Sequence, residues 1–162
     1  MKRAALVLAA LGLAASIAAA QPSELIGAPA PAIRARPLES DREVTLEAYR
    51  GRVVVLAFVA TWCGACRRMA PNLDALLDDH RDEGLEVLAL THESRTRIRA
   101  HVQQRSPRIP WLQCTGRTAV TYGADGLPTL VVIDRAGRVR ATYQGARDGT
   151  ADRLRRAVES LL

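Results

Sequence analysis

The hydrophobic residues of this chain form two kinds of segment, unbroken apolar runs and apolar positions at helical spacing. Residues 53–59 and 85–90 are almost entirely apolar, and a glycine stands shortly before each run, at Gly51 and Gly84. Strands that are apolar on both sides are typical of a parallel sheet whose two faces are covered. We therefore expect both runs to be buried strands.

Helical spacing follows each of these runs and returns at the end of the chain. The pattern predicts a helix from residue 63 to about residue 81, kinked by Pro71 inside it. It also predicts a helix from the N-cap Ser94 to about Gln104, and a terminal helix that begins at residue 148 or 150. The other expected elements are a short strand at 44–46, a single helical turn at 46–49, a strand-like piece at 111–112, a helical turn at 118–122 and an antiparallel hairpin of strands 129–133 and 139–143. This order predicts an α/β fold, a mixed sheet with helices on both faces.

The N-terminus has the organisation of a secretory signal peptide. Residues 1–3 are basic at two positions, residues 4–17 form an apolar run, and small residues precede Gln21. An uncleaved anchor is the alternative, but the run is short and rich in alanine. We divide the chain into a signal peptide (1–20), a proline-rich N-terminal extension (21–43) and one domain (44–162), with no membrane span after cleavage.

Charge and composition narrow the classes of function. The net charge is +6, and loss of Lys2 and Arg3 with the signal peptide would lower it to +4. Because the arginines are scattered and few aromatic residues lie among them, we expect no nucleic-acid partner. His80, His92 and His101 lack the spacing of a metal-ligand set, so we expect surface or satisfied histidines and no metal site. We expect a monomer.

Two cysteines stand where the first buried strand gives way to the long helix. Cys63 falls at the helix N-terminus, and two residues separate it from Cys66. The unpaired N–H groups of a helix N-terminus carry partial positive charge, so they stabilise a thiolate and lower its pKa. Cys66, one turn later, can attack a mixed disulfide that Cys63 has formed. We predict a dithiol–disulfide exchange site that needs no cofactor beyond this redox-active pair.

Several motifs carry a resemblance to a known family. They are Trp62-Cys63-Gly64-Ala65-Cys66, Pro71, residues 122–129 around Leu127-Pro128, and the lead-in at residues 26–31. In these motifs the chain resembles the thioredoxin-fold proteins, and more closely the exported TlpA-like or ResA-like thiol–disulfide oxidoreductases. The resemblance implies a thioredoxin fold, with a central mixed β-sheet flanked by helices. It also implies a protein disulfide reductase in the periplasm or another exported location.

Partners and substrate-binding residues follow from the same resemblance. It implies protein disulfides as substrates, a membrane thiol-transfer partner as reductant, and uses such as cytochrome c maturation or oxidase assembly. Pro128 would be the family's cis-proline, which turns the Leu127 backbone toward the cysteines to pair with a substrate backbone. Trp62 is expected to be an exposed aromatic platform for the substrate chain.

The chain also departs from the family pattern. Ala57 and Met69 occupy positions where relatives carry acids that help to move the proton of the second cysteine, and Ala65 stands where proline is usual. Glu93, at the end of the second buried strand, is a candidate replacement base for proton transfer. Since the residues between the cysteines tune thiolate stability, the reduction potential does not transfer by analogy.

Other functions stay open on the sequence. The same dithiol could act as an oxidase or isomerase, and Cys63 and Cys66 with a histidine could hold copper(I) in a metal chaperone. A Sco-type copper chaperone would have three residues between its cysteines, not two. The peroxiredoxin pattern places a threonine three residues before a single reactive cysteine, whereas Thr61 lies two before Cys63. Cys114 is expected to be a small buried hydrophobe rather than a resolving thiol.

Overall fold

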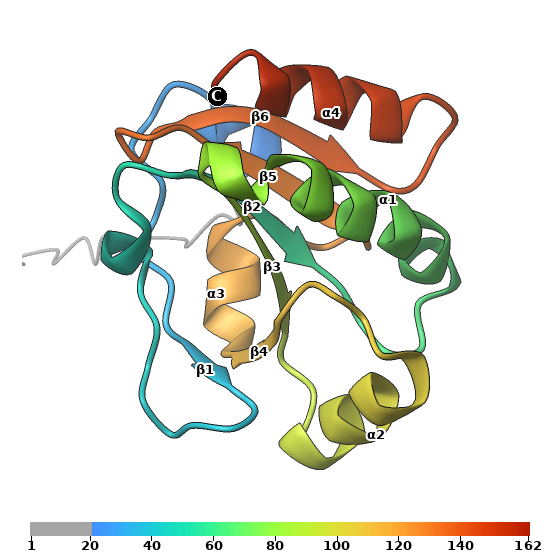
Figure 1. Cartoon of the computed structure of the whole chain (residues 1–162). Coiled ribbons are helices and arrows are strands. Elements are labelled where there is room, and N and C mark those ends of the chain that lie inside the picture. Colours follow the sequence, from blue (N-terminus) through green and yellow to red (C-terminus); the bar gives the residue numbers. More distant parts are fainter. Residues whose placement is uncertain (1–20) are drawn as a thin grey trace, which may run out of the picture.

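The computed structural model describes residues 21–162, and the predicted signal peptide, residues 1–20, lies outside the described residues. Six strands form one mixed sheet in the order β1-β4-β3-β2-β5-β6 (Figure 1). The strands are β1 (Ala35–Pro37), β2 (Val53–Phe58), β3 (Leu85–Thr91), β4 (Trp111–Cys114), β5 (Thr129–Ile133) and β6 (Val139–Gln144). The helices are α1 (Gly64–His80), α2 (Arg95–Arg105), α3 (Gly116–Thr121) and α4 (Thr150–Glu159), with short 3-10 helices η1 (Pro22–Leu25), η2 (Leu46–Tyr49) and η3 (Arg81–Glu83).

Strand β2 lies in the middle of the sheet and is buried on both faces. It pairs in parallel with β3 and antiparallel with β5. Successive side chains of a strand point to opposite faces, so β2 contributes to two cores. The core that includes α1 contains Val53, Val55 and Ala57, and the core on the other face contains Val54, Leu56 and Phe58. The apolar run therefore marks a doubly covered strand, as predicted.

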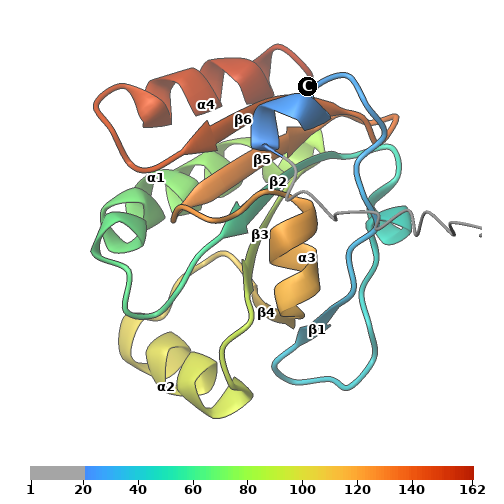
Figure 2. The same ribbon diagram turned by 180° about the vertical axis from the view of Figure 1, so that it is seen from behind.

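Helices cover the two faces unequally. Buried residues of α1, α2 and α4 form one core with the sheet, whereas α3 and the N-terminal segment pack on the other face (Figures 1 and 2). Tyr122, which follows α3, packs against Phe58 with ring centroids 5.2 Å apart and donates a hydrogen bond to the carbonyl of Pro31. Burial raises the pKa of Tyr122, so the phenol stays a donor. The predicted mixed sheet with helices on both faces is confirmed.

The N-terminal segment belongs to the sheet in a way the sequence did not predict. β1 pairs antiparallel with β4, with Ala35 opposite Cys114. The expected strand at 44–46 is wrong, because Val44 makes only an isolated bridge to Ala35, whereas the expected helical turn at 46–49 is confirmed as η2. β1 is short and ends in a proline, as is common at a sheet edge, so it has no apolar run to reveal it.

Helix α1 begins directly after Cys63 and continues through Pro71 to His80. Its buried face consists of Cys66, Met69, Leu73, Leu76 and Leu77. Pro71 is exposed, so the helix loses one backbone hydrogen bond without losing packing on its inner face. The predicted extents of α1 and α2 are confirmed to within a residue or two. Within residues 21–162, no helix is long and apolar enough to cross a membrane.

Candidate active site

Three segments meet at the end of the sheet where β2 and β3 terminate and β5 begins. In the sheet register, Phe58 at the end of β2 lies beside Leu90 of β3 and Thr129 at the start of β5. Parallel strands have their carboxyl ends on the same side of the sheet, and an antiparallel neighbour begins on that side. The residues that follow β2, follow β3 and precede β5 are therefore brought together, although they are far apart in the chain.

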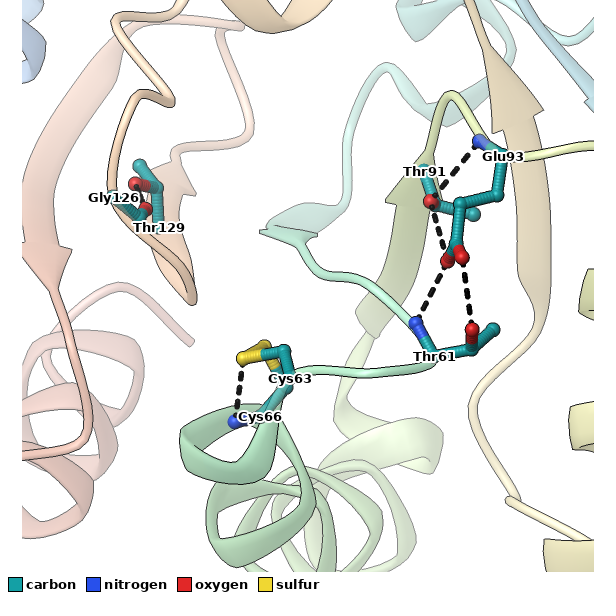
Figure 3. Close-up of a disulfide and its surroundings, with 7 residues drawn as sticks. All are labelled: Thr61, Cys63, Cys66, Thr91, Glu93, Gly126 and Thr129. Atoms are coloured by element: carbon teal, nitrogen blue, oxygen red, sulfur yellow. Dashed lines mark hydrogen bonds between the residues drawn. A yellow bond between two sulfur atoms is a disulfide. The ribbon is translucent and has the colours of Figure 1, made fainter.

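Cys63 and Cys66 form a disulfide at the N-terminus of α1 (Figure 3). Cys63 is the N-cap residue, and its sulfur accepts a hydrogen bond from the backbone N–H of Cys66 at 3.0 Å. A backbone N–H directed at this sulfur, together with the helix dipole, stabilises a thiolate on Cys63 once the disulfide is reduced. This geometry therefore favours Cys63 as the thiolate of the pair.

Two arginines add positive charge beside the first cysteine. The guanidinium groups of Arg67 and Arg68 lie 3.7 and 3.9 Å from the place where a Cβ of Gly64 would be. Both side chains are exposed, so salt screens their effect on a thiolate. They add positive charge at the N-terminus of α1, in the same direction as the helix dipole.

The two cysteines line different hollows of the surface. Cys63 lines a groove of about 520 Å³ together with Trp62 and Leu127, which we call the Cys63 groove. Cys66 lines a cavity of about 230 Å³ between α1 and the α2–β4 segment, which we call the Cys66 cavity. Because Cys66 does not line the Cys63 groove, a substrate in that groove meets Cys63 and not Cys66.

The segment before β5 closes one side of the Cys63 groove. The peptide bond between Leu127 and Pro128 is cis, and Pro128 is buried. The hydroxyl of Thr129 donates a hydrogen bond to the carbonyl of Gly126, which ties the two ends of this turn together (Figure 3). Trp62, also in the groove, is 67% exposed. An exposed aromatic ring therefore lies in the same groove as Cys63.

Glu93 contacts the loop before the cysteines and not the cysteines themselves (Figure 3). Its carboxylate accepts hydrogen bonds from the N–H and the hydroxyl of Thr61, at 2.7 and 2.8 Å, and from the Thr91 hydroxyl at 3.3 Å. Arg97 forms an ion pair with it at 3.6 Å. The contacts make Glu93 a positioning residue for the loop, and its part in proton transfer stays a prediction. The contact between Thr61 and Glu93 was not predicted from the sequence. The available indication was that Thr61 follows β2 and Glu93 follows β3, and these two strands pair in parallel.

Of the remaining cysteine and histidines, Cys114 and His92 line the Cys63 groove. Cys114 is a free, buried thiol, as expected, and burial raises its pKa to about 11. His80 pairs with Glu83 at the far end of α1, whereas His101 lines the Cys66 cavity. Across the part of the chain that the structure describes, no three His, Cys, Asp or Glu side chains are grouped as metal ligands.

Such a dithiol, built on this sheet with a cis-proline beside it, is the chemistry of thioredoxin-fold thiol–disulfide oxidoreductases. The comparisons with known proteins give the particular family. Residues 26–142 match the AhpC/TSA family. The thiol–disulfide oxidoreductase ResA of Bacillus thuringiensis subsp. konkukian (strain 97-27) is 30% identical over 122 residues, covering 74% of this chain and 70% of ResA. The chain belongs to the AhpC/TSA family and is similar within it to the ResA-like thiol–disulfide oxidoreductases.

Further relatives agree with this class. The thiol:disulfide interchange protein HelX of Rhodobacter capsulatus is 28% identical over 148 residues, covering 88% of this chain and 80% of HelX. A thiol:disulfide interchange protein of Chlorobium tepidum TLS has a TM-score of 0.70 at 20% identity, covering 82% of this chain and 94% of that one. The last similarity concerns the fold alone. The predicted thioredoxin fold and thiol–disulfide oxidoreductase activity are confirmed.

Proposed function

We propose that this protein is exported and reduces disulfide bonds in other proteins, with Cys63 as nucleophile and Cys66 as resolving thiol. One observation carries this assignment of roles. The sulfur of Cys63 receives the backbone N–H of Cys66 and lines the groove, whereas Cys66 lines a separate cavity. A thiolate must be both stabilised and accessible to attack, and Cys63 meets these conditions better than Cys66.

The reaction follows as two exchanges. The Cys63 thiolate attacks one sulfur of the substrate disulfide, a Cys63–substrate bond forms, and the other substrate sulfur leaves as a thiolate that takes a proton from solvent. Cys66 then loses its proton and attacks the Cys63 sulfur. The Cys63–Cys66 disulfide forms, and the substrate leaves as a dithiol. The substrate gains two electrons, and the cysteine pair of the enzyme is oxidised by the same two.

Substrate binding is assigned to the walls of the Cys63 groove. The Trp62 ring offers an apolar surface to an incoming chain, and the backbone of Leu127, before Pro128, is the edge along which an extended substrate segment pairs. Strand addition of this kind provides backbone hydrogen bonds that do not depend on sequence. The groove would then accept many disulfide-containing segments rather than one small molecule.

Export and recharging complete the proposal. Residues 1–20 would direct secretion, leaving the extension (21–43) and the domain (44–162) in the periplasm or an equivalent compartment. There a membrane thiol-transfer protein would reduce the Cys63–Cys66 disulfide again. Cytochrome c maturation or oxidase assembly is the proposed use, because both need reduced cysteines outside the cytoplasm.

Reduction of insulin by dithiothreitol tests the assignment. We expect the wild-type protein to accelerate it, Cys63→Ser to abolish the acceleration, and Cys66→Ser to accumulate as a mixed disulfide on Cys63. Cys114→Ala is expected to keep the activity, since the Cys114 thiol is buried and protonated. Full activity of Cys63→Ser, or a mixed disulfide trapped on Cys66, would overturn the assigned roles.

A further inference from the structure

The Cys66 cavity holds a titratable group that the exchange reaction described above does not use. The cavity lies between α1 and the α2–β4 segment, and its polar lining consists of Arg67, Asp74, His101 and Arg105 around Cys66. Its apolar lining includes Val59, Ala60, Ala70, Leu73, Ile109 and Trp111. At about 230 Å³ it is large enough for several water molecules, and its polar groups provide their partners.

The resolving step has a requirement that this cavity can meet. Cys66 is 6% exposed, and it must lose a proton before it can attack the Cys63 sulfur. Ala57 and Met69, which pack in the same core as Cys66, are buried apolar residues and cannot accept this proton. Proton transfer from Cys66 therefore needs another acceptor.

His101 has the right properties among the groups that line the cavity. Arg67 and Arg105 stay protonated and cannot accept a proton. Asp74 accepts hydrogen bonds from the backbone N–H groups of Arg108 and Ile109, both at 3.1 Å, through Oδ1, so this oxygen holds the α2–β4 loop, and a carboxylate is in general a weaker base than an imidazole. That leaves the imidazole of His101.

The surroundings of His101 fix its position and its protonation state. The ring packs against Trp111 with centroids 4.6 Å apart. Burial lowers the pKa of His101, the charges of Arg105 and Arg67 lower it further, and Glu93 opposes them. At neutral pH the ring is therefore neutral, so one ring nitrogen is free of a proton and can serve as a base.

We infer that His101 is the proton acceptor for Cys66 in the resolving step, acting through water in the Cys66 cavity. The proton of the Cys66 thiol passes to the imidazole, and the Cys66 thiolate attacks the Cys63 sulfur. The Cys63–substrate bond breaks, the substrate sulfur takes a proton from solvent, and the imidazolium returns its proton to solvent. When the disulfide is reduced again, His101 takes a proton from solvent and passes it to the departing Cys66 thiolate. The inference rests on dithiol exchange and holds for either direction of the reaction.

Reaction of the reduced protein with one equivalent of dithiobis(nitrobenzoate), an aromatic disulfide, separates the two steps. Attack by Cys63 releases one coloured thiolate, and attack by Cys66 releases the second. The test variant is His101→Phe, which keeps a ring against Trp111 but has no base. We expect an unchanged first phase and a second phase slowed on the order of a hundredfold.

The pH dependence distinguishes proton transfer from a structural effect. In the wild type the second phase should lose rate as pH falls through the pKa of His101, which lies below the ordinary histidine value of about 6.5. This loss of rate around the pKa of His101 should be absent in His101→Phe. An NMR titration of His101 should give the same midpoint.

His80→Phe is the matched control, since it removes a histidine at the far end of α1 and should preserve the wild-type profile. A wild-type second phase in His101→Phe would overturn the inference. So would an equal slowing of both phases in His101→Phe and His101→Gln, because that would indicate a structural role. Absence of the first phase in the wild-type protein would instead contradict dithiol exchange itself.

Discussion

The contact between Glu93 and Thr61 allows a quantitative prediction. Glu93 follows β3, Thr61 precedes Cys63, and the carboxylate joins them through two hydrogen bonds of 2.7 and 2.8 Å. The side chain of Glu93 is 8% exposed, so water replaces these bonds only in part when they are lost. Removing the charge should therefore cost stability and loosen the loop that leads to Cys63.

The expected magnitude follows from the two bonds. A hydrogen bond to a charged group contributes about 1.5–3 kcal/mol, and a neutral one about 1 kcal/mol. Glu93→Gln keeps one amide oxygen as an acceptor but removes the charge, so we expect a loss of about 2 kcal/mol in unfolding free energy. Thr61→Val removes only the hydroxyl bond and should cost about 1.5 kcal/mol.

Urea unfolding of the oxidised protein, followed by far-ultraviolet circular dichroism, measures both values. The loss of unfolding free energy in the double variant Glu93→Gln/Thr61→Val should be about 1 kcal/mol smaller than the sum of the two single losses, because the two side chains share a hydrogen bond. Arg97→Ala is the control: its side chain is 65% exposed, and loss of its ion pair with Glu93 should cost under about 0.5 kcal/mol. Additive single variants, or Glu93→Gln as stable as the wild type, would refute this reasoning.

Two further predictions concern Cys114 and Trp62. Because burial raises the pKa of Cys114 to about 11, only about one part in 10³ is thiolate at pH 8. Iodoacetamide should therefore modify Cys63 of the reduced protein at least about a hundredfold faster than Cys114 in a mass-spectrometric time course; equal rates would contradict this. Trp62→Ala should raise KM for a protein disulfide about tenfold, since it removes apolar contact area, and should leave the first phase with dithiobis(nitrobenzoate) nearly unchanged. An equal loss with both substrates would show that Trp62 acts on the cysteines.

The sequence predicted the parts of the molecule that local patterns determine. β2 and β3 were recognisable as doubly buried strands because their apolar runs have no polar alternation. Cys63 and Cys66 could be placed at the start of α1 because strand, dithiol and helix follow one another directly in the chain. These features need no knowledge of how distant segments pack.

Contacts between distant segments could not be predicted from the sequence. Glu93 and Thr61 lie 32 residues apart, and their contact depends on the register of β2 against β3. β1 has no sequence pattern typical of a strand, and its pairing with β4 defines it. His101 was one histidine among three until the fold placed it and Cys66 on the lining of one cavity. The nearness of Pro128 to the cysteines came from a family resemblance and not from spacing.

The reduction potential of the Cys63–Cys66 pair tests the central claim most directly. Cys114→Ala leaves a single redox pair, which can be equilibrated in thiol–disulfide buffers, trapped by alkylation and quantified by mass. A protein disulfide reductase should have a potential near about −270 mV or lower, the range of thioredoxin. A potential near about −120 mV, that of a strong oxidant, would contradict the reductase and indicate that the charges around Cys63 favour its thiolate too strongly.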